Sequence, residues 1–212
     1  MALELFYPVR NPIDEQNLFG QTSPMYTALG QLGHPGLDFE CPSGTPIYAP
    51  CDASAFYATD ENGGCGIYLR TPDAPNPAYN IILWHMYPAG TPGFPYGIPT
   101  AKGIVVDVKA GQLLGYSDNS GYPKESTGPH LHVGVMPIGP NELALNPDNG
   151  FLGCINPLPF FKGQYAEDIN NPAAPTPPLP APLPPNPTPV QESNWLTAVK
   201  NWLLAILKSI QK

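Results

Sequence analysis

Residues 126–136, Ser-Thr-Gly-Pro-His-Leu-His-Val-Gly-Val-Met, decide how this chain is organised. Successive side chains of a β-strand point to opposite faces, so a strand here presents the imidazoles of His130 and His132 on one face. Leu131 and Val133 fall on the other face, which is apolar as a core-facing surface should be. Two imidazoles placed in this way are half of a zinc site, because zinc binds neutral imidazole and takes further ligands from other segments. A half-buried strand with two polar residues on its wet face accounts for the pair equally well.

The composition favours a turn-rich β domain with a proline-rich segment over a helical protein, because 31 of the 212 residues are proline and 21 are glycine. The formal net charge of −8 provides no electrostatic footprint for nucleic acid. Residues 1–6 have neither the basic start nor the apolar run of a signal peptide, and no segment reaches the ~20 apolar residues of a membrane span. We therefore expect a protein that binds no nucleic acid and has no general export signal.

The four cysteines lack the Cys-x-x-Cys spacing of a structural zinc site; they are Cys41, Cys51, Cys65 and Cys154. They form one or two disulfide bonds, or they are plain buried thiols. We expect a disulfide bond, and the pairing stays open.

Alternation of apolar and polar residues predicts an antiparallel sheet. The expected strands are residues 45–49, 53–59, 66–71, 79–86, 104–108 and 112–116, after a short strand near residues 6–9. Ile81, Leu83 and His85 should share one face of the fourth of these strands, which places His85 at a rim of the sheet. The loop of residues 87–103, rich in proline and glycine, is expected to form one wall of a groove. Residues 137–165 are expected to be irregular and to pack along the sheet edge.

His34 and Asp38 lie in Gly-His-Pro-Gly-Leu-Asp-Phe, residues 33–39. The proline and glycine between them break any helix, so a loop brings the imidazole and the carboxylate together. Both groups are zinc ligands by type, although an Asp-capped turn with a surface histidine is the simpler interpretation of this segment alone. The chain has four histidines, at positions 34, 85, 130 and 132, so with Asp38 five groups are available for one site.

The amino-acid composition changes from residue 169 onward. Ten prolines between residues 171 and 190 predict an extended arm that spans roughly 60 Å at ~3.1 Å per residue, within a linker that we place at residues 169–191. Residues 192–212 carry apolar side chains at the three-four spacing of one helical face, with three lysines and one glutamate, and predict an amphipathic helix. Such a helix binds a membrane surface or a protein partner, or it folds back onto the preceding domain.

The order of these motifs resembles the lysostaphin-like zinc metallopeptidases, which have a LytM-type domain. The motif around His34 and Asp38, the stretch Pro-Ser-Gly-Thr-Pro at residues 42–46, a strand ending in His85, and Ser-Thr-Gly-Pro-His-Leu-His follow one another within residues 15–137. The resemblance implies a mainly β fold, an antiparallel-sheet metallopeptidase domain with long loops. We place this domain at residues 1–168, with its core at 15–137, followed by the linker and the C-terminal helix.

The resemblance further implies that His34, Asp38 and His132 bind one Zn²⁺ per chain, and that His130 and His85 are the catalytic pair. Three protein ligands leave a fourth position for water, whose pKa zinc lowers toward ~7. In this scheme His130 is the general base, and His85, as imidazolium, stabilises the oxyanion. Which of the two protonates the leaving amine stays open.

Tyr26 is similar in position to a tyrosine with which family members steady the transition state, so it is a candidate substrate-binding residue; packing is an alternative role. The N-terminal region is too short for the long inhibitory pro-region that some relatives carry, but an asparagine there, such as Asn11 or Asn17, could occupy the open zinc position.

The family's substrate class implies an endopeptidase that cleaves the peptides of bacterial peptidoglycan. Without an export signal, the chain fits a bacteriolytic phage endolysin or a virion-associated enzyme, made in the cytoplasm and acting on the cell wall. The alternative is a non-hydrolytic family member that binds peptidoglycan or activates another enzyme, tethered through the C-terminal helix. Such relatives usually lack one or more of the five zinc and catalytic groups, whereas this chain has all five.

Overall fold

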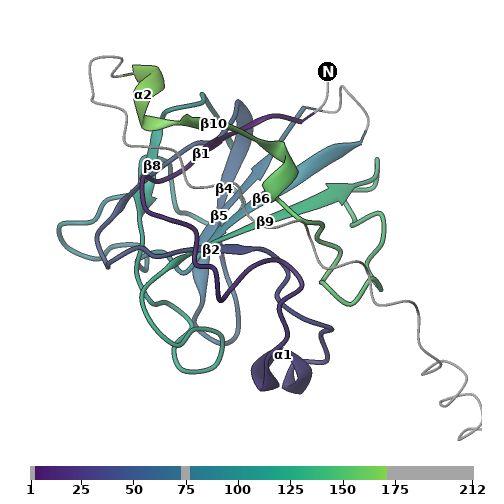
Figure 1. The fold of residues 1–212 in the computed structure, drawn as a ribbon. Coiled ribbons are helices and arrows are strands. Elements are labelled where there is room, and N and C mark those ends of the chain that lie inside the picture. The colour runs from purple at the N-terminus through teal and green to yellow at the C-terminus, as the bar shows by residue number, and fades with distance from the viewer. Residues whose placement is uncertain (1–2, 73–76, 171–212) are drawn as a thin grey trace, which may run out of the picture. The chain divides into compact units, whose positions relative to one another are not determined.

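The computed structural model describes residues 3–72 and 77–170 (Figure 1). The predicted linker at 169–191 lies outside the described residues except for its first two positions, and the predicted helix at 192–212 lies wholly outside them. No helix within the described ranges has the length and apolar character needed to cross a membrane.

Six strands form the central sheet, in the order β2-β9-β6-β5-β4-β7, with every neighbouring pair antiparallel. They are β2 (Leu37–Phe39), β4 (Ala53–Thr59), β5 (Cys65–Arg70), β6 (Ala78–Trp84), β7 (Val106–Val108) and β9 (Leu131–Ile138). The predicted mainly antiparallel fold is thus confirmed. The strand expected at 53–59 is found with the same bounds, because the turn residues on both sides of it are strong breakers.

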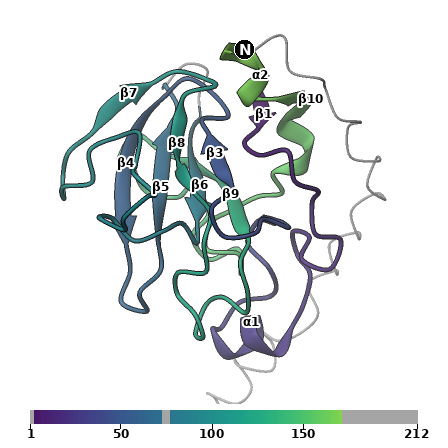
Figure 2. The ribbon, with the colours of Figure 1, turned by 90° about the vertical axis from the view of Figure 1, so that its left-hand side faces the viewer.

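Two small sheets accompany the central one, so the single sheet expected from the sequence is an incomplete description. Strand β3 (Pro46–Tyr48) pairs antiparallel with β8 (Leu113–Tyr116), and β1 (Leu5–Tyr7) pairs parallel with β10 (Phe161–Tyr165). The helices are short: α1 (Pro24–Ala28), η1 (Leu158–Phe160) and α2 (Glu167–Asn170). Helices α1 and α2 lie at opposite ends of the domain in both views (Figures 1 and 2).

The segment 137–165 is less irregular than expected. Bridges from Ile155 to Val135 and from Ala144 to Ile138 place it along β9, as predicted. Its last part, however, forms β10. The ring of Phe161 stacks on Tyr7 with 4.6 Å between centroids, and this aromatic packing explains why β10 pairs with β1.

The main core lies on one face of the central sheet, where alternate residues of the strands are fully buried; examples are Ile67, Leu69, Ile81, Leu83, Leu131 and Val133. The other face carries the groove described below.

All four cysteines are free thiols, so the expected disulfide bond is wrong. Burial raises the pKa of Cys41, Cys51 and Cys154 to about 12, which leaves these thiols protonated. The Cys65 thiol is engaged elsewhere, 3.0 Å from the carbonyl oxygen of Met86. The cysteines therefore act as small packing residues.

Candidate active site

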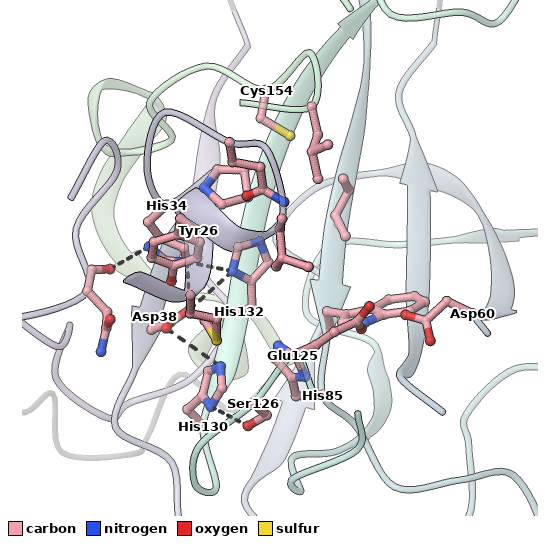
Figure 3. Close-up of a pocket in the computed structure, with 18 of the residues that line it drawn as sticks. Tyr26, His34, Asp38, Asp60, His85, Glu125, Ser126, His130, His132 and Cys154 are labelled. Carbon is pink, nitrogen blue, oxygen red and sulfur yellow. Dashed lines mark hydrogen bonds and ion pairs between the residues drawn. The ribbon is translucent and has the colours of Figure 1, made fainter. Parts of the chain in front are cut away.

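Three side chains from two parts of the chain meet at one point. Strands β2 and β9 pair so that Asp38 lies directly opposite His132. The loop before β2 brings His34 to the same place, and Gly36 in that loop allows close packing, since a Cβ there would lie 2.6 Å from Cε1 of His132. The atoms His34 Nε2, Asp38 Oδ1 and His132 Nδ1 are separated by 2.9, 3.1 and 3.2 Å (Figure 3).

The distances between these three atoms are close to those between the ligand atoms of a zinc site. Ligand atoms that lie ~2.1 Å from a tetrahedral zinc ion are about 3.4 Å from one another. The three atoms here, which form the candidate metal group within the described ranges, are almost that far apart. The predicted ligands His34, Asp38 and His132 are therefore brought together.

The protonation of the three groups also fits a cation. Nδ1 of His34 lies 2.9 Å from the backbone oxygen of Asn17, which can only accept, so Nδ1 carries the proton and Nε2 turns its lone pair inward. Burial lowers the pKa of His132 and favours the neutral ring. Burial alone would raise the pKa of Asp38, but the His132 and His34 rings in contact with its carboxylate outweigh it and hold this pKa well below its usual range. Two ring nitrogens and a carboxylate that point to one place are a set of ligand atoms suited to a divalent cation.

His130 reaches the site from just outside the strand that was expected to carry it. Strand β9 begins at Leu131, and His130 forms an isolated bridge with Asp118. The strand cannot start earlier because its neighbours end: β6 pairs no further than His132, and β2 no further than Leu131. Nε2 of His130 still lies 3.6 Å from Asp38 Oδ2, so the expected proximity of His130 to the predicted metal ligands is found.

His85 does not share the face of Ile81 and Leu83, which was the expectation from strand alternation. Strand β6 ends at Trp84, and His85 has a φ of 64°, in the left-handed region. This backbone conformation reverses the alternation, so Ile81 and Leu83 remain in the core while His85 lines the groove. Its ring centroid lies 4.4 Å from that of His130.

Both catalytic candidates present Nε2 to the groove. Nδ1 of His85 lies 2.7 Å from the carbonyl oxygen of Ser120, and Nδ1 of His130 lies 2.8 Å from that of Gly128, so each ring donates from Nδ1. Burial, together with the nearby His130 and His132, lowers the pKa of His85 to about 3. His85 is therefore neutral at neutral pH, which corrects the expectation of an imidazolium.

A cavity of about 540 Å³ contains the five groups. Trp84, which pairs with His132 across the sheet, lies on its floor with Ile82 and Tyr68, and α1 and residues 125–130 provide its walls. The loop 87–103 contributes no residue, so its predicted role as a wall is wrong. Its aromatic side chains pack elsewhere: Phe94 stacks on Tyr87, and the Tyr96 ring meets Tyr57 edge-on; these are contacts away from the cavity lining.

Tyr26 lies beside the candidate metal ligand His34. Its ring stacks on that of His34 with 5.3 Å between centroids, and it is 6% exposed. Burial, with Asp38 nearby, raises the pKa of its hydroxyl, which stays protonated. The side chains of the two asparagines considered as metal ligands are bound elsewhere: Asn11 donates to the carbonyl of Glu40, and Asn17 donates to Asp14.

Two features of the groove were missed from the sequence. The Asn17 carbonyl orients His34, and a backbone group leaves no trace in the residue pattern. Asp60 and Glu125 lie near each other on the His85 side of the groove (Figure 3), although 65 positions separate them along the chain. Burial and the neighbouring Asp60 raise the pKa of Glu125.

Comparison with known proteins agrees with this architecture. No protein-family model matches the chain. A curated protein described as an uncharacterised metalloprotease of Haemophilus influenzae is 30% identical over 102 residues, which is 47% of this chain and 18% of that protein. The chain therefore spans less than a fifth of the length of this relative.

Among solved structures, the antimicrobial peptidase lysostaphin from Staphylococcus simulans is similar with a TM-score of 0.51 and 22% identity, over 84% of this chain and 60% of lysostaphin. The catalytic domain of lysostaphin, in another structure, gives a TM-score of 0.44 with 24% identity, over 74% of this chain and 91% of that domain. The described part of this chain has the fold of the lysostaphin-like peptidases, as its histidine motifs predict.

Proposed function

We propose that this protein is a zinc-dependent endopeptidase that hydrolyses peptide bonds of bacterial peptidoglycan. The observation that carries the proposal is the triangle of His34, Asp38 and His132 with two further imidazoles, His85 and His130, beside it in one cavity. A catalytic zinc site has three protein ligands and an open position, and zinc bound there lowers the pKa of a water molecule. A structural site would be closed by a fourth protein ligand.

The geometry supports different roles for the two remaining histidines. His130 takes the proton of the attacking water at Nε2, because this atom lies 3.6 Å from Oδ2 of the proposed metal ligand Asp38. His130 then returns that proton to the leaving amine. His85 has no proton at Nε2 to donate in the resting state, since its single ring proton is held by the Ser120 carbonyl. His85 Nε2 instead accepts a hydrogen bond and orients the water or the scissile amide.

The substrate class rests on the resemblance to lysostaphin-like enzymes, and the open cavity is large enough to admit part of a peptide. We further propose that the protein is a lysin of phage type that acts on the cell wall. In this proposal residues 192–212 deliver the enzyme to a membrane surface or to a protein partner.

The test is hydrolysis of purified peptidoglycan by the full chain, measured as the release of new amino groups. We expect activity with one zinc per chain, loss of activity with a chelator, and recovery when zinc is restored. The variants His130→Ala and His85→Ala should lose hydrolysis and keep zinc. Loss of zinc from His130→Ala would contradict its assigned role, and a zinc-loaded wild type that binds peptidoglycan without cleaving it would indicate the non-hydrolytic alternative.

A further inference from the structure

One segment provides the hydrogen-bond partners of both catalytic candidates. Residues 117–130 connect β8 to β9, and within them the carbonyl of Ser120 accepts Nδ1–H of His85 while the carbonyl of Gly128 accepts Nδ1–H of His130. A neutral imidazole has one ring proton, so a carbonyl at Nδ1 leaves Nε2 as the free acceptor. The proposed function needs a free Nε2 on both rings. The present inference therefore rests on the proposed function.

A buried hydroxyl anchors each of these carbonyls. Ser120 is 8% exposed, and its hydroxyl accepts from the backbone N–H of Cys65 at 3.1 Å and lies 3.3 Å from the Cys65 carbonyl. These contacts tie the segment to the first residue of β5. Ser126 is 1% exposed, and its single hydroxyl proton is shared between two acceptors, Oδ1 of Asn119 at 2.5 Å and the Gly128 carbonyl at 2.9 Å; the hydroxyl oxygen lies 3.4 Å from Nδ1 of His130 (Figure 3). Buried hydroxyls are retained where they satisfy backbone groups in this way.

The position of His85 makes such an anchor necessary. A left-handed φ at a residue with a Cβ is disfavoured, and it persists only where surrounding contacts hold it. The carbonyl of His85 accepts from the backbone N–H of Asp118, so the same segment holds both the backbone and the ring of His85. If the segment shifted, the ring would lose its partner at Nδ1, and the proton would be free to move to Nε2.

We propose that Ser120 and Ser126 are positioning residues that fix the Nδ1–H tautomers of His85 and His130. Neither serine is assigned a contact with the reacting atoms. Ser120 acts through its own carbonyl, which its hydroxyl holds against β5, and Ser126 acts through the carbonyl of Gly128.

Ser117 provides a matched control. It is fully buried in the same segment, and its hydroxyl also accepts from one backbone N–H, that of Thr45 at 3.2 Å, and donates to one carbonyl, that of Pro42 at 2.8 Å. Its own carbonyl accepts from the N–H of Gly44 and not from a histidine. Ser117→Ala therefore removes the same kind of contacts as Ser120→Ala without touching a catalytic ring.

The experiment is ¹⁵N NMR of the histidine rings in the zinc-loaded full chain, combined with steady-state kinetics. The chain has four histidines, so the spectrum is simple, and the signals of His85 and His130 are assigned with their alanine variants. We expect Ser120→Ala to shift His85 toward a mixture of tautomers and to lower kcat about 10- to 100-fold with little change in KM. Ser126→Ala should do the same at His130.

Ser117→Ala should keep both tautomers and the wild-type kcat, and Ser120→Thr, which retains the hydroxyl, should restore the tautomer of His85. The proposal is overturned if Ser120→Ala and Ser126→Ala keep the wild-type tautomers. It is also overturned if Ser117→Ala shifts them equally, since the effect would then be general loosening. Should Ser120→Ala not fold, Ser126→Ala decides the question at the second ring. Tautomer shifts in a protein that cleaves no peptidoglycan would support the positioning roles while refuting the proposed function.

Discussion

The left-handed backbone at His85 permits a test in which two variants lose the same ring. His85→Ala and His85→Gly both remove the imidazole, and they differ only by the Cβ at a φ of 64°. In the folded state the Cβ costs about 1–2 kcal/mol in this conformation. Glycine has more conformational freedom than alanine in the unfolded state, and this lowers the free energy of unfolding of the glycine variant by about 0.4–1 kcal/mol. We therefore expect His85→Gly to be the more stable variant by about 1 kcal/mol.

Thermal unfolding of the two purified variants measures this difference. For a domain of this size, about 1 kcal/mol corresponds to roughly 2–4 °C in Tm. Asp107 provides the control position, because it is exposed in the middle of β7 with an ordinary strand backbone. There the order should reverse, with Asp107→Gly less stable than Asp107→Ala. If His85→Ala were as stable as His85→Gly, the backbone at this residue would not be left-handed, and the explanation of how the ring enters the groove would fail.

Three further results are expected. Asp38→Asn should weaken zinc binding more than about 100-fold in competition with a chelating dye, since even changes behind the ligands cost 10- to 100-fold; unchanged affinity would exclude Asp38 from the metal site. Zinc at 100 times its Kd should stabilise the protein by about 2.7 kcal/mol, measured as a rise in Tm that a chelator reverses; an unchanged Tm would contradict the His34, Asp38 and His132 site. Because its folded-state pKa is raised, Glu125 favours folding below its ordinary pKa and loses this contribution as the pH rises through the folded value. Glu125→Gln should thus be more stable than wild type in urea denaturation at pH 7, and the difference should disappear near pH 4; a pH-independent difference would show that the carboxyl is not perturbed.

Strand positions, and the grouping of His34, Asp38 and His132, were predictable from the sequence because they depend on local patterns. The alternation at residues 53–59 and the turn residues around it define β4 directly. His34, Asp38 and His132 were grouped by motif, and the pairing of β2 with β9 places them together. The strand positions needed only the residue types and their spacing, whereas the choice of His132 rather than His130 as a metal ligand came from the resemblance to the lysostaphin-like metallopeptidases.

What failed depends on the backbone or on contacts between distant segments. Strand alternation assigned His85 to the core face, and a single left-handed residue reversed it. The loop 87–103 was assigned to the groove by its length, whereas aromatic contacts such as that of Tyr96 with Tyr57 direct it elsewhere. The disulfide expectation failed because cysteine count and spacing say nothing about whether thiols meet in space.

The pairing of β1 with β10 has a consequence for engineering. Leu5 lies opposite Phe161 and Tyr7 opposite Tyr165, and Arg10 forms ion pairs with Glu167 and Asp168. The two ends of the described domain are therefore neighbours. A short covalent connection between these ends, with new termini opened in the loop 87–103, would yield a circular permutant in which His34, Asp38, His85, His130 and His132 keep their positions.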